Sequence, residues 1–303
     1  MTGGDIIVAQ AYITDVMPKE RRTEALGYIM AAIGVGVFFG PALGGVLSSF
    51  YGPRMPFWFA AVMAAIVVLM THITLDESLS ATQRVANRAN KQGGGSLSWG
   101  RILRIRELRY VLSLTFLLQF VFSMCQATFA LWAAAVLFHH YAPSTVDLGI
   151  GLLASLFAIT LIVTQTVFLR RLLERMGEIN LLILSLITHV LGLLLLAIFS
   201  TLWFIIPGIV LQSFGVGTTY PLLQSLATKI VPEEKRGGVL GYFNGTFSLG
   251  TIFGSAIAGL LFEIQPTFQL WVGVGVLLIA MLISIILRQH LTTQKEQLRS
   301  SHR

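Results

Sequence analysis

Polar side chains are rare inside the long apolar stretches of this sequence, so those that occur there are the first candidates for chemistry. Among the 14 acidic residues, only Asp5 lies well inside such a stretch. A carboxylate in hydrocarbon is costly unless it faces a cavity, takes up a proton or has a partner. Asp5 is therefore a candidate proton- or cation-binding residue. The alternative is that it lies at the frayed start of a helix.

Uncharged polar residues in other apolar stretches can orient a ligand without the desolvation cost of a charge. Gln119 and Gln126 are seven positions apart and so share one helix face. The other candidates of this kind are Gln212, Gln224, Asn244 and His189. Hydrogen bonding between helices is the competing interpretation for each, and we expect His189 to be a packing histidine with its hydrogen bonds satisfied.

The elements that position these residues are predicted to be membrane-spanning helices. Hydrophobic residues make up 55% of the chain and charged residues 12%, and the mean hydropathy is +0.77. A soluble fold of this size needs far more polar surface. Stretches long enough to cross the hydrocarbon as helices occur at 27–49, 55–75, 109–138, 146–169, 179–199, 202–226, 239–262 and 268–287, with a partial one at 2–17.

The basic residues predict the orientation of these helices. All but one of the 21 lysines and arginines fall in alternate connections, and only Arg54 lies in the opposite set. Because basic residues are retained on the cytoplasmic side, the C-terminus is predicted to be cytoplasmic in a multi-pass protein of the plasma or inner membrane. Topology thus explains the net charge of +7, and the expected partner is the lipid bilayer rather than nucleic acid.

The long polar connection at 76–108 predicts a division of the chain. We expect a partial N-terminal bundle of three helices at 1–75, a cytoplasmic linker at 76–108, a six-helix bundle at 109–287 and a basic cytoplasmic tail at 288–303.

An internal repeat supports two related bundles. The pattern from Pro18 to Tyr28 recurs 214 positions later, from Pro232 to Tyr242, with the Pro, Glu, Arg, Leu, Gly and Tyr positions shared. Two copies in the same orientation are typical of transporters built from parallel repeats. Three predicted helices precede the trio of the second copy and none precedes the first, so we expect three helices to be missing upstream. The alternative is a true nine-helix protein.

A glycine motif in the stretch at 27–49 resembles a known family. Its members are Gly27, Gly36, Gly40, Pro41, Gly44 and Gly45. They resemble the fifth-helix motif of drug:proton antiporters in the major facilitator superfamily, and the preceding residues 2–22 resemble the fourth helix and its cytoplasmic loop. Physically, glycines at this spacing let helices approach closely and Pro41 bends the helix. Plain helix packing is the alternative.

Charged loop residues extend the resemblance. The segment 172–177 resembles a degenerate helix 8–9 loop motif of that superfamily, in which Glu174 and Arg175 would belong to a cytoplasmic charge relay. Glu178 stands where that motif has a basic residue. Further gate candidates in comparable loops are Asp15, Arg22 and Arg236. Solvated charged turns are the competing interpretation.

The resemblance implies an all-α polytopic protein with a two-bundle fold, whose nine helices correspond to helices 4–12 of twelve. It implies a monomer that exports small amphipathic drugs in exchange for protons by alternating access. The helices that line its central cavity would carry Gln119, Gln126, Gln212 and Asn244. A nutrient or metabolite carrier and an inactive remnant are the alternatives.

The loops show no carboxylate or histidine cluster, and the chain has no phosphate-binding loop and one cysteine. We therefore expect neither an enzyme nor a cofactor or metal.

Overall fold

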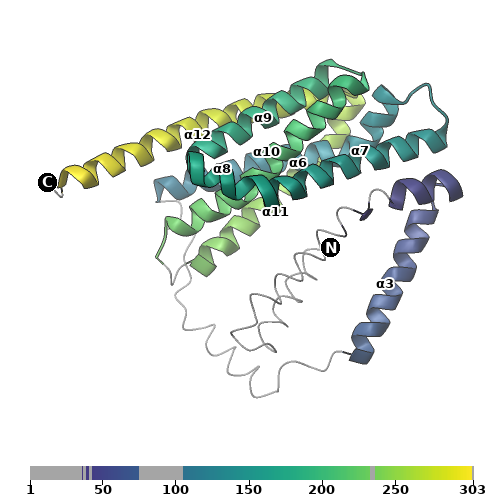
Figure 1. Ribbon diagram of the computed structural model, residues 1–303, viewed down its shortest axis with the longest axis horizontal. Coiled ribbons are helices and arrows are strands. Elements are labelled where there is room, and N and C mark those ends of the chain that lie inside the picture. Colours follow the sequence, from purple (N-terminus) through teal and green to yellow (C-terminus); the bar gives the residue numbers. More distant parts are fainter. Residues whose placement is uncertain (1–35, 37–38, 41–42, 75–104, 233–235, 302–303) are drawn as a thin grey trace. The chain divides into compact units, whose positions relative to one another are not determined.

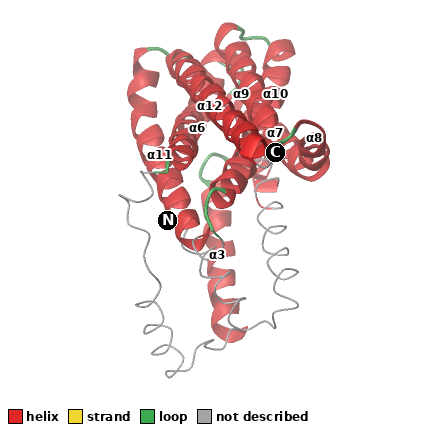
Figure 2. Ribbon diagram, turned by 90° about the vertical axis from the view of Figure 1, so that its left-hand side faces the viewer, coloured by secondary structure: helices red, strands yellow, loops and turns green. Residues whose placement is uncertain are grey.

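The computed structural model describes residues 36, 39–40, 43–74, 105–232 and 236–301 (Figure 1). Within these residues every regular element is a helix, as Figure 2 shows. The elements are α3 (Met55–Thr74), α6 (Arg106–Trp132), α7 (Pro143–Val163), α8 (Leu169–Met176), α9 (Glu178–Ile198), α10 (Leu202–Lys229), α11 (Arg236–Ile264) and α12 (Phe268–Ser301). Short π-helical segments, η1 (Ala133–Leu137) and η2 (Thr164–Phe168), follow α6 and α7.

Seven helical stretches within the described residues are long and apolar enough to cross a membrane. They are Met55–Ile73, Arg106–Leu137, Pro143–Met176, Glu178–Ile198, Leu202–Lys229, Gly238–Ile264 and Phe268–His290. Each overlaps a stretch predicted from the sequence, and the all-α polytopic fold class is confirmed. The predicted stretch at 2–17 and most of that at 27–49 lie outside the described residues.

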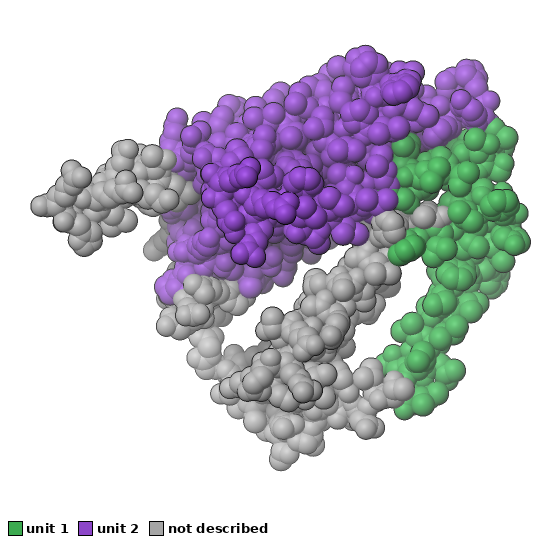
Figure 3. Space-filling model, viewed as in Figure 1, with its two compact units in different colours: residues 1–96, 142–155 green, residues 97–141, 156–303 purple. Residues whose placement is uncertain are grey.

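The chain divides into two compact units, drawn in Figure 3. Unit 1 comprises residues 1–96 and 142–155, and unit 2 comprises residues 97–141 and 156–303. In unit 1, the helical residues 43–51 approach the first turns of α7 closely. A Cβ atom at Gly45 would lie 3.0 Å from the Asp147 carbonyl oxygen and from the Gly151 Cα atom. The Ser48 hydroxyl also donates a hydrogen bond to the Asp147 carboxylate.

Unit 2 is a helical bundle built from two tightly packed pairs. α6 packs along α11, α9 packs along α10, and α12 contacts both α6 and α9. The core consists of apolar side chains with no exposed area, among them Leu108, Leu114, Met124, Leu186, Leu193 and Leu277. Large apolar side chains cover the outer surface as well, which is the arrangement expected where the solvent is lipid.

Glycines set the distance between the paired helices. A Cβ atom at Gly192 on α9 would lie 2.6 Å from the Gln212 backbone nitrogen on α10. On α11, a Cβ atom at Gly250 would lie 2.8 Å from the Phe116 carbonyl oxygen, and one at Gly254 would overlap the Phe120 carbonyl group. These positions require glycine, because real Cβ atoms do not come this close to backbone atoms.

A short charged helix ends where the bundle turns back into α9. α8 stops at Gly177, whose φ of +74° lies in the left-handed region that glycine adopts without strain. α9 begins at the next residue, Glu178, and runs back through the apolar region. Gly177 therefore fixes the position of Glu178 at the start of α9.

We predict that Gly254→Ala destabilises the protein by about 1–3 kcal/mol, because the new methyl group must push α11 away from α6. Gly245→Ala is the matched control on the same helix, since nothing lies within 4 Å of a Cβ atom there. The control should leave stability unchanged or raise it slightly, as alanine favours helix over glycine. Thermal unfolding of the two purified variants in detergent measures the difference, and equal midpoints would contradict the packing described.

Candidate functional site

Several residues singled out from the sequence lie outside the described part of the chain. They are Asp5, Asp15, Arg22, Gly27 and Pro41. Of the motif glycines that the structure describes, Gly45 lies against α7, whereas a Cβ atom at Gly36, Gly40 or Gly44 would meet nothing within 4 Å. Close helix approach, the property expected of the motif, is thus visible at Gly45.

The two glutamines of α6 have different surroundings. Gln119 is half-buried, and its Nε2 atom donates a hydrogen bond to Thr251 Oγ1 on α11 at 2.9 Å. Ser123, one turn further along α6, donates to the Thr251 carbonyl oxygen at 2.9 Å. Gln126 is exposed on the surface of unit 2. Gln119 therefore joins α6 to α11, whereas the Gln126 side chain is exposed on the surface of unit 2.

Gln212 and Asn244 also differ in burial. Gln212 is buried in the contact between α9 and α10, where its backbone faces Gly192. Asn244 is exposed on α11, and Ser248, one turn along, is exposed beside it. An amide on a membrane-spanning helix is poorly solvated by lipid, so Gln126 and Asn244 favour a surface that faces water or protein.

A small cavity lies in the middle of unit 2, among α6, α9, α10 and α11. Its volume is about 40 Å³, and its lining includes Gln119, His189, Thr219 and Tyr220. His189 is 1% exposed, and neither ring nitrogen has a hydrogen-bond partner among the residues that the structure describes. The side chain is buried, as expected of a packing histidine, but no described residue satisfies its hydrogen bonds.

The charged residues near α8 form two separate ion pairs. Glu174 pairs with Arg170 at 2.9 Å, within α8, and both side chains are largely exposed. Arg175 is exposed as well. Arg236 is the first residue of α11. The structure thus places the predicted gate residue Glu174 in a local pair on the surface.

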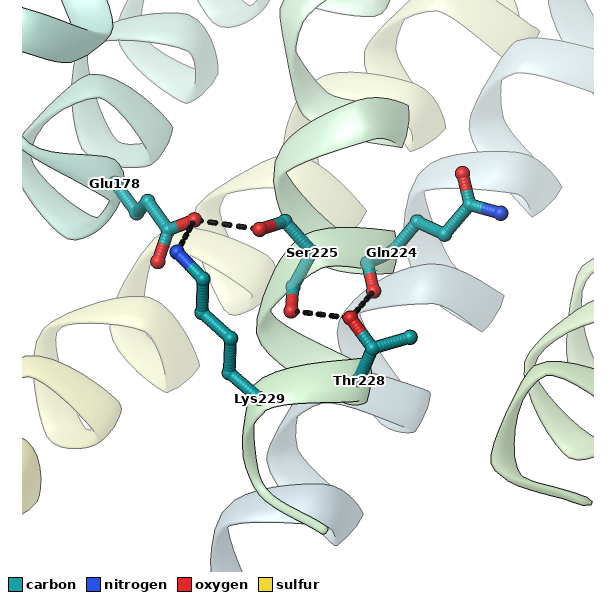
Figure 4. Close-up of polar contacts among 5 residues, drawn as sticks. All are labelled: Glu178, Gln224, Ser225, Thr228 and Lys229. Atoms are coloured by element: carbon teal, nitrogen blue, oxygen red, sulfur yellow. Dashed lines mark hydrogen bonds and ion pairs between the residues drawn. The ribbon is translucent and has the colours of Figure 1, made fainter. Parts of the chain in front are cut away.

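A second ion pair joins α9 to α10 (Figure 4). The Lys229 ammonium group lies 2.7 Å from Glu178 Oε1, and Ser225 Oγ donates to the same oxygen at 2.6 Å. The Glu178 side chain is 17% exposed, which distinguishes this pair from the one in α8. Both residues line a cavity of about 870 Å³ at this end of unit 2, together with Glu107 and Arg288.

Sequence reasoning missed the pairing of Glu178 with Lys229. In the sequence, Glu178 is singled out only as a departure from a loop motif. The sequence signal was the reversed charge at position 178, which calls for a basic partner on a neighbouring helix. No group of three or more metal-ligating side chains occurs within the described residues.

Helices that are long and apolar enough to span a membrane and that pack through glycine contacts are the architecture of a multi-pass membrane protein. The chain belongs to the Major Facilitator Superfamily, whose family model matches residues 1–146 and 115–302. It is 26% identical over 298 residues to the tetracycline resistance protein, class H, of Pasteurella multocida, a match that covers 97% of this chain and 72% of that protein.

Other relatives agree with this assignment. The quinolone resistance protein NorA of Staphylococcus aureus is 26% identical over 291 residues, which is 94% of this chain and 70% of that protein. Among solved structures, the human organic anion transporter MFSD10 is 21% identical with a TM-score of 0.61, over 93% of this chain and 68% of that one. A bacterial homologue of the iron transporter ferroportin is 18% identical with a TM-score of 0.67, over 90% and 65%. The solved structures show the fold.

We predict that Glu178→Ala destabilises the protein by about 1–2 kcal/mol, because Lys229 and Ser225 lose a half-buried anionic acceptor. Glu174→Ala is the matched control, since its pair with Arg170 is exposed and should contribute less than about 0.5 kcal/mol. Urea or thermal unfolding in detergent compares the two. An equal loss of stability in Glu174→Ala and Glu178→Ala would contradict this prediction, because the burial of the two ion pairs would then not determine their contribution to stability.

Proposed function

We propose that this protein is a proton-coupled exporter of small amphipathic drugs that works by alternating access. Two curated relatives that cover nearly the whole chain are named for resistance to tetracycline and to quinolones. The glycine motif from Gly27 to Gly45, which resembles that of drug:proton antiporters, supports the same branch of the superfamily.

One structural observation supports a substrate path in particular. Gln126 on α6 and Asn244 on α11 are exposed on helices that pack along each other. Amides can bind a neutral or charged compound through hydrogen bonds while the surrounding apolar surface holds its hydrophobic part. Gln119 and Gln212 are proposed to support this surface from within the bundle.

Rocking motion requires helices that contact closely yet without large interlocking side chains. The contact of Gly45 with the backbone of α7 in unit 1 has this character. In the proposed cycle, Asp5 takes up and releases the coupling proton, and Asp15, Arg22, Glu174, Arg175 and Arg236 close the cytoplasmic side. The protein is proposed to work as a monomer in the plasma or inner membrane, with its C-terminus in the cytoplasm.

We predict that drug-sensitive bacterial cells that express the chain accumulate less of a quinolone and less tetracycline than cells with an empty vector. A proton ionophore should raise accumulation to the control level. Asp5→Asn should abolish the difference, because the amide cannot take up a proton, and Asp5→Glu, the matched control, should retain part of it.

Membrane abundance of each variant is measured in parallel, so that loss of protein is distinguished from loss of coupling. Accumulation that is the same with and without the chain would contradict drug export. Efflux that persists in the ionophore would contradict proton coupling. Uptake of a nutrient in place of drug efflux would favour a nutrient or metabolite carrier of the same fold.

A further inference from the structure

His189 is a buried polar residue of unit 2 that has no hydrogen-bond partner among the described residues. It is 1% exposed, and both ring nitrogens are buried without a hydrogen bond to any described residue. An unpaired polar atom in this environment is destabilising, and buried polar atoms in native proteins nearly always have partners. The partner of this histidine is therefore a group that the described residues do not supply, either water or a ligand.

The packing of α9 against α10 holds His189 in place. A Cβ atom at Gly215 would lie 2.7 Å from the His189 Cβ atom, so glycine there lets α10 come against the histidine. The nearby hydroxyl groups have no hydrogen left to donate to the imidazole, because Thr218 Oγ1 donates to Ser185 Oγ at 2.5 Å and Ser185 Oγ donates to the Leu181 carbonyl oxygen. His189 also lines the small cavity.

Three polar residues that line this cavity, Thr115, Thr219 and Gln119, donate hydrogen bonds to neighbouring groups. Thr115 donates to the Val111 carbonyl oxygen at 2.8 Å, and Thr219 donates to the Val216 carbonyl oxygen at 3.1 Å. The Gln119 amide nitrogen donates one of its two hydrogens to Thr251. Each of the three keeps an oxygen that can accept, and a neutral imidazole adds an accepting nitrogen. The cavity therefore offers several acceptors to a hydrogen-bond donor.

Aromatic side chains form the rest of the wall. Tyr220 lies edge-on to Phe243 and Phe247, with ring centroids 5.5 Å and 5.2 Å apart. Tyr220 is 37% exposed, so the cavity extends to the surface of unit 2 at this side. A volume of about 40 Å³ accommodates one small polar group, whereas a whole drug-sized molecule needs several hundred Å³.

We propose that this cavity is a subsite for the hydrogen-bond-donating head, a hydroxyl or amine, of an amphipathic compound. The His189 imidazole accepts the hydrogen bond, and the apolar part of the compound lies against Tyr220 and Phe247 at the mouth. Export of the same compound rests on the function proposed above. Binding at the subsite does not depend on export and is measured separately.

The test compares two fluorescent probes of nearly the same shape on the purified full chain in lipid nanodiscs. One probe, 1-naphthol, carries an O–H donor, and the other, 1-methoxynaphthalene, carries none. We expect the wild-type protein to bind 1-naphthol about five- to tenfold more tightly, after correction for partition into empty nanodiscs, which is the effect of one net hydrogen bond. His189→Leu should remove this preference, and His189→Gln should restore part of it through its amide oxygen.

Stability separates this role from a structural one. His189→Leu removes two unpaired polar atoms, so its unfolding temperature should equal or exceed that of the wild type. Equal affinity of the wild type for both probes, no binding of either, or a preference that persists in His189→Leu would each overturn the proposal, and the cavity then holds water alone. A His189-dependent preference in a protein that fails to export drugs would leave the subsite standing and reject the export function.

Discussion

Helices inside a membrane associate mainly through close van der Waals contact, because lipid tails solvate apolar side chains as well as another helix does. In unit 2 this contact is made at backbone distance, where Gly192 and Gly215 join α9 to α10 and Gly250 and Gly254 join α11 to α6. These glycines place polar side chains of neighbouring helices within hydrogen-bonding reach. The Gln119–Thr251 bond and the Ser185–Thr218 bond both lie beside such contacts.

The same helix packing determines which polar side chains bond to a neighbouring helix and which are left to bind a substrate. Gln119 is used between helices by its amide nitrogen, whereas Gln126 and Asn244 are exposed and His189 is buried without a described partner. Structural polar groups in a membrane protein pair within the bundle, and those that bind substrate remain turned toward a cavity or an aqueous path. The Glu178–Lys229 pair belongs to the first kind, because it ties the start of α9 to the end of α10.

The sequence predicted the helices well and the pairings between them poorly. Hydropathy identified the span of α9 because a helix in lipid must be continuously apolar over its length. It predicted no partner for Glu178, since Lys229 lies 51 positions away and the match depends on how two helices pack. Gln119 was a candidate from its position within α6, but its bond to Thr251 required the register of α6 against α11. His189 was expected to be hydrogen bonded, and its close contact with Gly215 beside a cavity was not visible in the sequence.

Proton-coupled drug export is tested most directly with the purified chain in sealed liposomes. A pH gradient is imposed across the membrane, and the uptake of a quinolone into the lumen is followed over time. The proposed antiport predicts drug accumulation in liposomes with an acidic lumen, beyond that in protein-free liposomes with the same gradient, and its loss when an ionophore collapses the gradient. Accumulation no greater than in the protein-free liposomes, or accumulation that is independent of the gradient, would contradict it.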